Sequence, residues 1–179
     1  MLRTQTCLLS AMFILVTSSA FAQQDEAKPP TQVELADGKL TLPVAGDWKS
    51  VEPRSRIVQF EFSIPAAEGD EKPGRLTIMA AGGSIDANIA RWVGQFRSAD
   101  GKPLADDAKK VERKKVSDLD VHVVDLSGSY QDKARPFGPG VNRPDYRMLA
   151  AIVPTKGHGV WFIKSYGPRE TSAHVRTAT

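Results

Sequence analysis

Histidine is the first residue type to consider for catalysis or metal binding, and this 179-residue chain has three: His122, His158 and His174. A metal site needs several ligands that converge at fixed spacing, and the sequence has no His-x-His or His-x-x-x-His pair. His122 shares strand parity with Val124, which indicates a partly buried core histidine, and Asp125 faces the other side of the strand. We therefore expect no metal site and no histidine general base.

Serine chemistry is equally unsupported by the sequence. The segment Gly82-Gly83-Ser84-Ile85-Asp86 lacks the second glycine of a nucleophile elbow, and Ser84 suits the N-cap of a helix. Ser127-Gly128-Ser129 indicates a bend or bulge inside a strand, because the glycine-lysine pattern of a phosphate loop is absent. The sequence thus predicts no catalytic residue, no cofactor-binding residue and no cofactor.

The first 22 residues have the three parts of a secretory signal peptide. Arg3 provides the positive start, residues 7–16 form a short apolar core, and Ala20-Phe21-Ala22 is a small-x-small cleavage site. Cleavage near Ala22 predicts an exported protein, periplasmic or secreted. The only cysteine, Cys7, would leave with the leader and precedes the apolar core, so neither a disulfide scaffold, a thiol enzyme nor a lipid anchor is expected.

Charge and composition give the organisation of the mature chain. The net charge of +3 includes Arg3, so about +2 remains after cleavage, which is too small to predict nucleic-acid binding. Residues 23–32 have almost no apolar content and are typical of a flexible tether, while residues 33–179 suit a single domain. The apolar core of the leader is too short to span a membrane, and no second apolar span follows.

Period-two alternation predicts an antiparallel sheet of about six to eight strands. Residues 56–64 are the clearest example, since Val58, Phe60, Phe62 and Ile64 share one face. Further strands are expected at 33–36, 39–42, 75–80, 109–116, 119–130, 145–153 and 160–166. The run 109–115 holds five basic residues in seven, which is typical of a solvated edge strand.

One segment has helical periodicity instead. The large apolar residues Ile85, Ile89, Trp92 and Phe96 are spaced by four, three and four, which predicts a helix over about 85–97 with this stripe on the sheet. Asn88, Arg91 and Gln95 would lie on its exposed side. Together the patterns favour an α+β domain in which helices flank the sheet.

The order of these features resembles a known family. Leu42-Pro43 precedes Trp48, a hairpin ends in Gly82-Gly83-Ser84, the helix carries Arg91-Trp92 and Gln95-Phe96, and Lys164-x-x-Gly167-Pro168 closes the chain. This arrangement is similar, from about Val33 onward, to the exported bacterial branch of the PsbP-like fold, whose relatives include the extrinsic photosystem II subunit and a eukaryotic Ran-binding import factor. The resemblance implies an α/β/α sandwich and no reaction; relatives with established roles mostly dock to other macromolecules.

The C-terminus departs from that family. The resemblance implies a closing helix that covers the sheet after Gly167-Pro168, but only residues 169–179 follow, with Val175 as their sole large apolar residue. We therefore expect a C-terminus that is truncated or frameshifted and leaves part of the sheet uncovered.

Two surfaces are candidates for interaction. Residues 131–143 are expected to form a long loop, and Arg135, Phe137 and Arg143 suit partner contact because arginine and aromatic residues are enriched at binding hot spots. The second candidate is the helix side with Asn88, Arg91 and Gln95.

The leading functional hypothesis is a non-enzymatic exported domain that binds a protein or a cell-envelope component. The alternative is a small-molecule binder or cryptic hydrolase with a pocket between helix 85–97 and the sheet. A deep pocket that contains His122 or Arg91 with a perturbed carboxylate would favour this alternative. A third hypothesis is a remnant without function.

Overall fold

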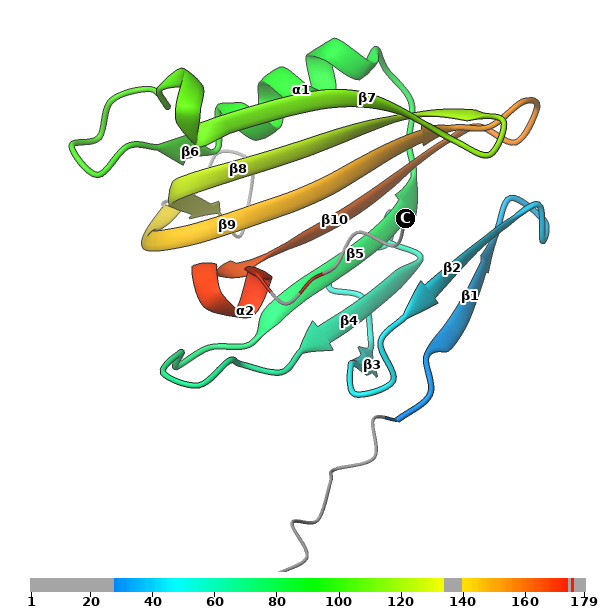
Figure 1. Cartoon of the computed structure of the whole chain (residues 1–179), viewed down its shortest axis with the longest axis horizontal. Coiled ribbons are helices and arrows are strands. Elements are labelled where there is room, and N and C mark those ends of the chain that lie inside the picture. The colour runs from blue at the N-terminus through cyan, green and yellow to red at the C-terminus, as the bar shows by residue number, and fades with distance from the viewer. Residues whose placement is uncertain (1–27, 134–139, 174, 176–179) are drawn as a thin grey trace, which may run out of the picture.

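The computed structural model describes residues 28–133, 140–173 and 175, and Figure 1 shows a strongly twisted sheet as its main element. The elements of the described residues are β1 (Thr31–Leu35), β2 (Leu40–Val44), β3 (Lys49–Val51), β4 (Phe60–Ile64), β5 (Gly74–Ala80), α1 (Ile85–Val93), β6 (Phe96–Arg97), a 3₁₀ helix (Asp106–Ala108), β7 (Lys109–Val116), β8 (Leu119–Lys133), β9 (Gly140–Pro154), β10 (Val160–Pro168) and α2 (Arg169–Ala173).

The main sheet has eight strands, in the order β3-β4-β5-β10-β9-β8, and β8 pairs on its far side with both β7 and β6. All pairings are antiparallel. β10 lies between β5 and β9, so the last strand of the chain joins the two halves of the sheet. β7 pairs with β8 alone, which makes it the edge strand that its lysines predicted.

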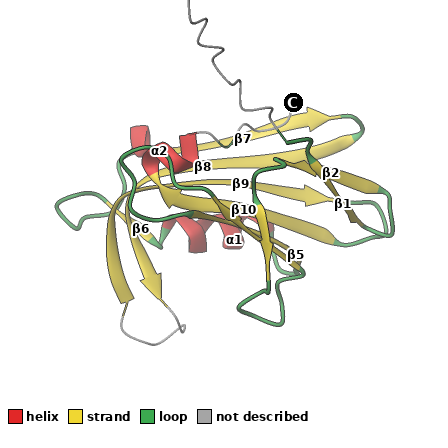
Figure 2. Ribbon diagram, turned by 90° about the horizontal axis from the view of Figure 1, so that it is seen from below, coloured by secondary structure: helices red, strands yellow, loops and turns green. Residues whose placement is uncertain are grey.

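The two faces of the sheet have different covers, as Figure 2 shows: α1 lies on one side, and α2 and the β1–β2 hairpin lie on the other. On the hairpin side the core includes Val33, Leu35, Ile64, Leu76 and Ile78. On the α1 side it includes Trp92, Phe96, Leu126, Met148 and Phe162. Burial of both faces follows from the period of two, which sends successive residues of each strand to opposite sides.

The expected α+β class, with an α/β/α sandwich of helices around the sheet, is wrong. The described chain is mostly β, and its two α-helices have nine and five residues. A hairpin takes the place of one helical layer, because Val33, Leu35 and Val44 alternate with polar residues and bury as strands against the sheet. An antiparallel sheet is the part of the expectation that the structure retains.

The helix is shorter than its periodicity predicted. Ser84 is the N-cap, and its Oγ accepts a hydrogen bond from the Ala87 N–H at 3.1 Å. The helix ends at Val93 with Gly94 as C-cap, so Phe96 is fully buried from strand β6 rather than from the helix. Phe96 follows Trp92 by four residues, so the apolar spacing predicted a helix that continued beyond Val93.

Residues 131–133 and 140–143, which the sequence predicted as parts of a long loop, belong to strands, while 134–139 lie outside the described residues. Gln131 pairs with Asn142, and Lys133 with Gly140, as β8 and β9 continue beyond the core. Closer to the core, the register of the β8–β9 pairing shifts between Gly128 and Tyr130, which is the bulge that Ser127-Gly128-Ser129 predicted.

Candidate functional site

A cavity of about 810 Å³ lies between α1 and the sheet. Its walls come from α1, from the segment that follows α1, and from β5, β8, β9 and β10. Trp92, Met79 and Tyr130 contribute apolar and aromatic surface, and Gln95, Gln131 and Asn142 contribute amides. Most of the lining side chains are polar or charged, so the cavity suits a polar or charged ligand better than an apolar one.

Every charged side chain that lines this cavity is a cation. They are Arg91, Arg97, Lys133 and Lys164, and no aspartate or glutamate among the described residues lines it. None of the four forms an ion pair within the described part of the chain. The cavity therefore has a concentrated positive charge that the neighbouring side chains do not neutralise.

Arg91 is held in place by Asn88. The Arg91 guanidinium donates from Nη2 to Asn88 Oδ1 at 2.7 Å, and Asn88 Nδ2 in turn donates to the Ser84 carbonyl at 2.9 Å. Asn88 is only 7% exposed, although the helical pattern predicted it on the outer side. A neutral amide thus orients Arg91 without cancelling its charge.

Arg97 is positioned by the bulge in β8. Its strand β6 pairs with β8 so that Arg97 lies opposite Ser129, directly beside Gly128. Its Nη1 donates to the carbonyls of Gly94 at 3.0 Å and Phe96 at 2.7 Å, so its partners are again neutral. The end of α1, the bulge and the guanidinium form one local unit.

Lys164 enters the cavity from β10 and is half-buried. Its Nζ lies 4.7 Å from the centre of the Tyr166 ring, a cation–π distance. Burial, followed by the positive charges of Arg75 and Arg91, lowers the pKa of Lys164 to about 8, while Asp132 acts in the opposite direction. An anion in the cavity would stabilise the charged form of this lysine.

Beside Lys164, Arg75 forms a buried ion pair. The guanidinium donates to Glu61 Oε1 at 2.6 Å and Oε2 at 2.8 Å, and it also donates to the Tyr166 hydroxyl. The Glu61 side chain is 1% exposed. Burial alone would raise the pKa of Glu61, but the hydrogen bonds from Arg75 and the Arg54 N–H hold it below its usual value. Glu61 thus pairs with Arg75 and not with Lys164.

Tyr130 and Gln95 add to the polar character of the wall. The Tyr130 ring lies 5.2 Å from the rings of both Phe96 and Tyr166, and burial raises the pKa of its hydroxyl, which therefore stays protonated. The buried Gln95 Oε1 has no hydrogen-bond partner within the described residues. A buried acceptor without a partner is costly, so a ligand donor here would be favourable.

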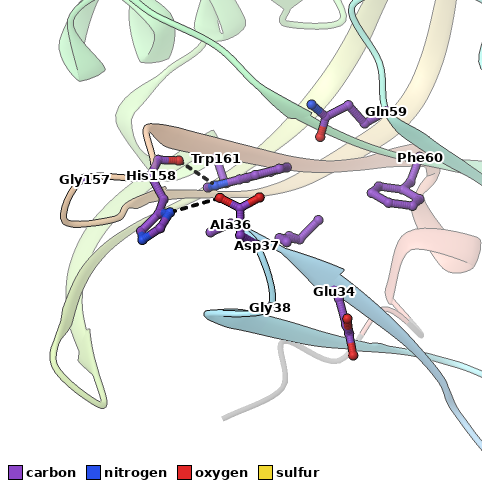
Figure 3. A pocket seen from close by; sticks show the side chains of 10 residues that line it. Glu34, Ala36, Asp37, Gly38, Gln59, Phe60, Gly157, His158 and Trp161 are labelled. Atoms are coloured by element: carbon purple, nitrogen blue, oxygen red, sulfur yellow. Dashed lines mark hydrogen bonds and ion pairs between the residues drawn. The ribbon is translucent and has the colours of Figure 1, made fainter.

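A second cavity, of about 530 Å³, lies between the turn of the β1–β2 hairpin and the start of β10 (Figure 3). His158 Nδ1 lies 3.3 Å from Asp37 Oδ2, and Trp161 Nε1 donates to the His158 carbonyl at 3.2 Å. Asp37 is 91% exposed at its side chain. The pair links hairpin and sheet at the surface, where ion pairs contribute little.

A third cavity, of about 430 Å³, lies on the hairpin side of the sheet near Ala173 and Val175. Asp125 and Arg147 line it and form a two-point ion pair, with distances of 2.9 and 2.7 Å. Lys110 and Lys114 also line it and both pair with Glu112, so the charged side chains of this cavity are paired, unlike those of the first. Val175 packs against the core on this side. The truncation of the C-terminus that we expected from sequence stays a prediction.

The structure places the predicted interaction residues in different environments. Arg91 and Gln95 line the first cavity, and Asn88 supports it from α1. Arg143 lies on β9, where its Nε and Nη2 are each 3.3 Å from Asp132 Oδ2. Arg135 and Phe137 lie outside the described residues, as do His174 and the predicted leader.

Sequence reasoning missed Lys164, Arg97 and the Glu61–Arg75 pair. The only local signal for Lys164 was an isolated lysine in the apolar strand 160–166, on the same parity as Phe162. Glu61 likewise alternates with Phe60 and Phe62, which indicated a solvent face; its burial depends on Arg75 from the neighbouring strand. His122 is half-buried on the α1 side and does not line the first cavity.

The described residues, 28–133, 140–173 and 175, contain no cluster of three or more metal-ligating side chains of the His, Cys, Asp and Glu types. None of their helices combines the length and the apolar character that crossing a membrane requires. Comparisons with protein-family models, curated proteins and solved structures found no match to this chain. A proposal for its function therefore rests on the geometry of the site.

Proposed function

We propose that this protein binds small organic anions, each with a carboxylate or phosphate group on an apolar body, in the cavity between α1 and the sheet. The observation that supports this most directly is the set of four cations, Arg91, Arg97, Lys133 and Lys164, around a cavity that no described carboxylate lines. The proposal develops the small-molecule alternative that the sequence left open.

The chemistry of the cavity matches the two parts of such a ligand. Arginine guanidinium groups suit carboxylates and phosphates because their N–H donors are planar and paired. Arg91 and Arg97 each use one nitrogen on a neutral acceptor, which leaves further donors for an anion. Trp92 and Met79 offer the apolar surface on which the body of the ligand would pack.

Isothermal titration calorimetry tests the proposal with a matched pair of probes. We expect 3-phenyllactate, an aromatic carboxylate, to bind, and 3-phenyl-1,2-propanediol, in which a neutral alcohol replaces the carboxylate, to bind at least about tenfold more weakly. The affinity for 3-phenyllactate should fall as salt is raised, because ions screen partly exposed charges. Equal affinity for the two probes, or no binding of the carboxylate, would contradict the proposal.

Charge variants locate the binding site. Arg91→Gln should weaken 3-phenyllactate binding about tenfold, since a charge-assisted hydrogen bond is lost. Arg113→Gln is the matched control, because it removes the same charge from β7, where Arg113 pairs with Asp120 away from the cavity. If both variants bind equally, the anion is attracted by net charge and not by this site.

The other functional hypotheses stay predictions. Docking through residues 131–143 rests largely on Arg135 and Phe137, outside the described residues. Export rests on the leader sequence; N-terminal sequencing of the exported protein would support it if the mature chain begins at Gln23.

A further inference from the structure

Lys164 differs from the other lysine of the anion cavity in its surroundings. Lys133 is exposed, whereas Lys164 is half-buried and comes from the central strand β10. No ion pair or hydrogen bond of the Lys164 ammonium group occurs within the described residues; its contact is the face of the Tyr166 ring. A lysine with this environment is poorly stabilised as a cation.

The charged groups around Lys164 come from four elements. Arg75 from β5 and Arg91 from α1 are cations that disfavour its protonation, and Asp132 from β8 favours protonation more weakly. On β10 itself, the Tyr166 hydroxyl accepts a hydrogen bond from Arg75. Arg75 donates to both carboxylate oxygens of Glu61, and these hydrogen bonds fix its position.

The result is an amine that is neutral far more often than an ordinary lysine. Its pKa of about 8 means that roughly half of the molecules carry the free amine near pH 8. A desolvated lysine beside another cation is the arrangement that activates an amine as a nucleophile toward carbonyl groups. Arg91 and Arg97 line the same cavity and can hold a carboxylate next to that carbonyl.

We propose that Lys164 is a covalent binding residue that forms an imine with 2-oxo acids, whose carboxylate is bound by Arg91 and Arg97. This inference rests on the proposed anion-binding function and names one ligand class for it. The Nζ lone pair attacks the carbonyl carbon, the carbonyl oxygen takes up a proton, and the carbinolamine then loses water and a proton from nitrogen. The amine and the ketone become an imine and one water, without any oxidant or reductant.

Reductive trapping tests the imine on the full chain. The protein is incubated with phenylpyruvate and sodium cyanoborohydride, which reduces an imine to a stable secondary amine, and the modified lysines are mapped by peptide mass spectrometry. We expect at least about tenfold more adduct on Lys164 than on Lys133, which lines the same cavity in exposed form. Trapping at Lys164 should already occur at pH 7, where an ordinary exposed lysine is almost fully protonated.

Two variants check the roles of the participants. Lys164→Arg keeps the positive charge but removes the nucleophile, so it should abolish the specific adduct. Arg91→Gln should reduce trapping at Lys164 several-fold by weakening the hold on the carboxylate, whereas Arg113→Gln should not. An adduct spread evenly over surface lysines would overturn the inference, and this readout uses the unaltered chain.

The matched hydroxy acid separates the two proposals. 3-Phenyllactate has the carboxylate and the ring of phenylpyruvate but no ketone, so it cannot form an imine. Binding of 3-phenyllactate without an adduct from phenylpyruvate would overturn the imine and leave the anion-binding function intact. Failure of both compounds to bind would overturn both proposals.

Discussion

Arg75 forms a bidentate ion pair with Glu61 across neighbouring strands, with Nε 2.6 Å from Oε1 and Nη2 2.8 Å from Oε2. The Glu61 side chain is 1% exposed and the Arg75 side chain 24% exposed. A third donor, the Arg54 N–H, lies 3.0 Å from Glu61 Oε2. Glu61 is therefore a fully hydrogen-bonded buried charge, which makes its removal costly.

Substitution of Glu61 by glutamine should destabilise the fold. It leaves the partly buried Arg75 guanidinium without its counter-ion, and breaking such a buried pair costs about 3 kcal/mol of unfolding free energy. Urea unfolding followed by circular dichroism measures the change. Asp120→Asn is the control, because the Arg113–Asp120 pair at 3.0 Å is solvent-exposed and should contribute little. Equal effects of the two variants would show that burial does not strengthen the Glu61 pair.

The same carboxylate should make stability depend on acid pH. Burial opposes ionisation of Glu61, but the hydrogen bonds from Arg75 and the Arg54 N–H outweigh it and lower its pKa in the folded state. The stabilisation is thus complete above the unfolded-state pKa of about 4.3 and is lost as the pH falls through the lower folded-state pKa. As the pH is lowered from about 7 to about 3, the urea midpoint of unfolding should fall less steeply in Glu61→Gln than in the parent chain. Parallel pH profiles would contradict this assignment.

Glycine at position 128 should be required both for the fold and for the anion cavity. Gly128 has φ of +153°, and a Cβ there would lie 2.5 Å from the Arg97 carbonyl oxygen. Gly128→Ala should cost about 3 kcal/mol and also weaken 3-phenyllactate binding, since β6 and Arg97 must shift. Gly157→Ala is the control: its φ is +80° but nothing lies within 4 Å of the added Cβ. It should cost about 1 kcal/mol and leave binding unchanged.

Thr171 should anchor α2 to the β4–β5 connection. Asp70 Oδ2 accepts hydrogen bonds from the Thr171 N–H at 2.8 Å and from its hydroxyl at 2.6 Å, and Thr171 Oγ1 accepts from the Ala67 N–H at 3.0 Å. Thr171→Val keeps the shape of the side chain but removes the hydroxyl. We expect the free energy of unfolding, measured by thermal unfolding, to fall by about 2 kcal/mol. Thr41→Val, at an exposed position, should change stability little.

Sequence periodicity predicted those elements in which apolar residues recur on one buried face. Ser84 identified the start of α1, and the apolar alternation identified most strands. Phe96 continued the helical spacing by coincidence, because a buried strand residue after Gly94 fills the same core. The extensions of β8 and β9 beyond the core gave no alternation, since residues such as Gln131 and Asn142 are polar and lie where no buried face exists.

The candidate site was only partly accessible from sequence. Arg91 was identified because it shares α1 with apolar residues, and Gln95 because the same spacing continues past Gly94, although Gln95 lies beyond the end of the helix. Lys164 and Arg97 could not be identified as site residues from sequence, because strand pairings between distant segments bring them to the cavity. The period of two gives the face of a strand but not the strand beside it, and the environment of Lys164 depends on Arg75 from β5 and on Arg91 from α1.

The central place of β10 has a consequence for the order in which the cavity is assembled. Tyr166 contacts Arg75 across 91 positions of sequence, and Lys164 belongs to the same late strand. During synthesis from the N-terminus, the ribosome delivers this strand after all the other described walls of the cavity. Contacts over such separations also form slowly. The anion binding that we propose should therefore be the last property to appear, because a chain that lacks β10 also lacks Lys164.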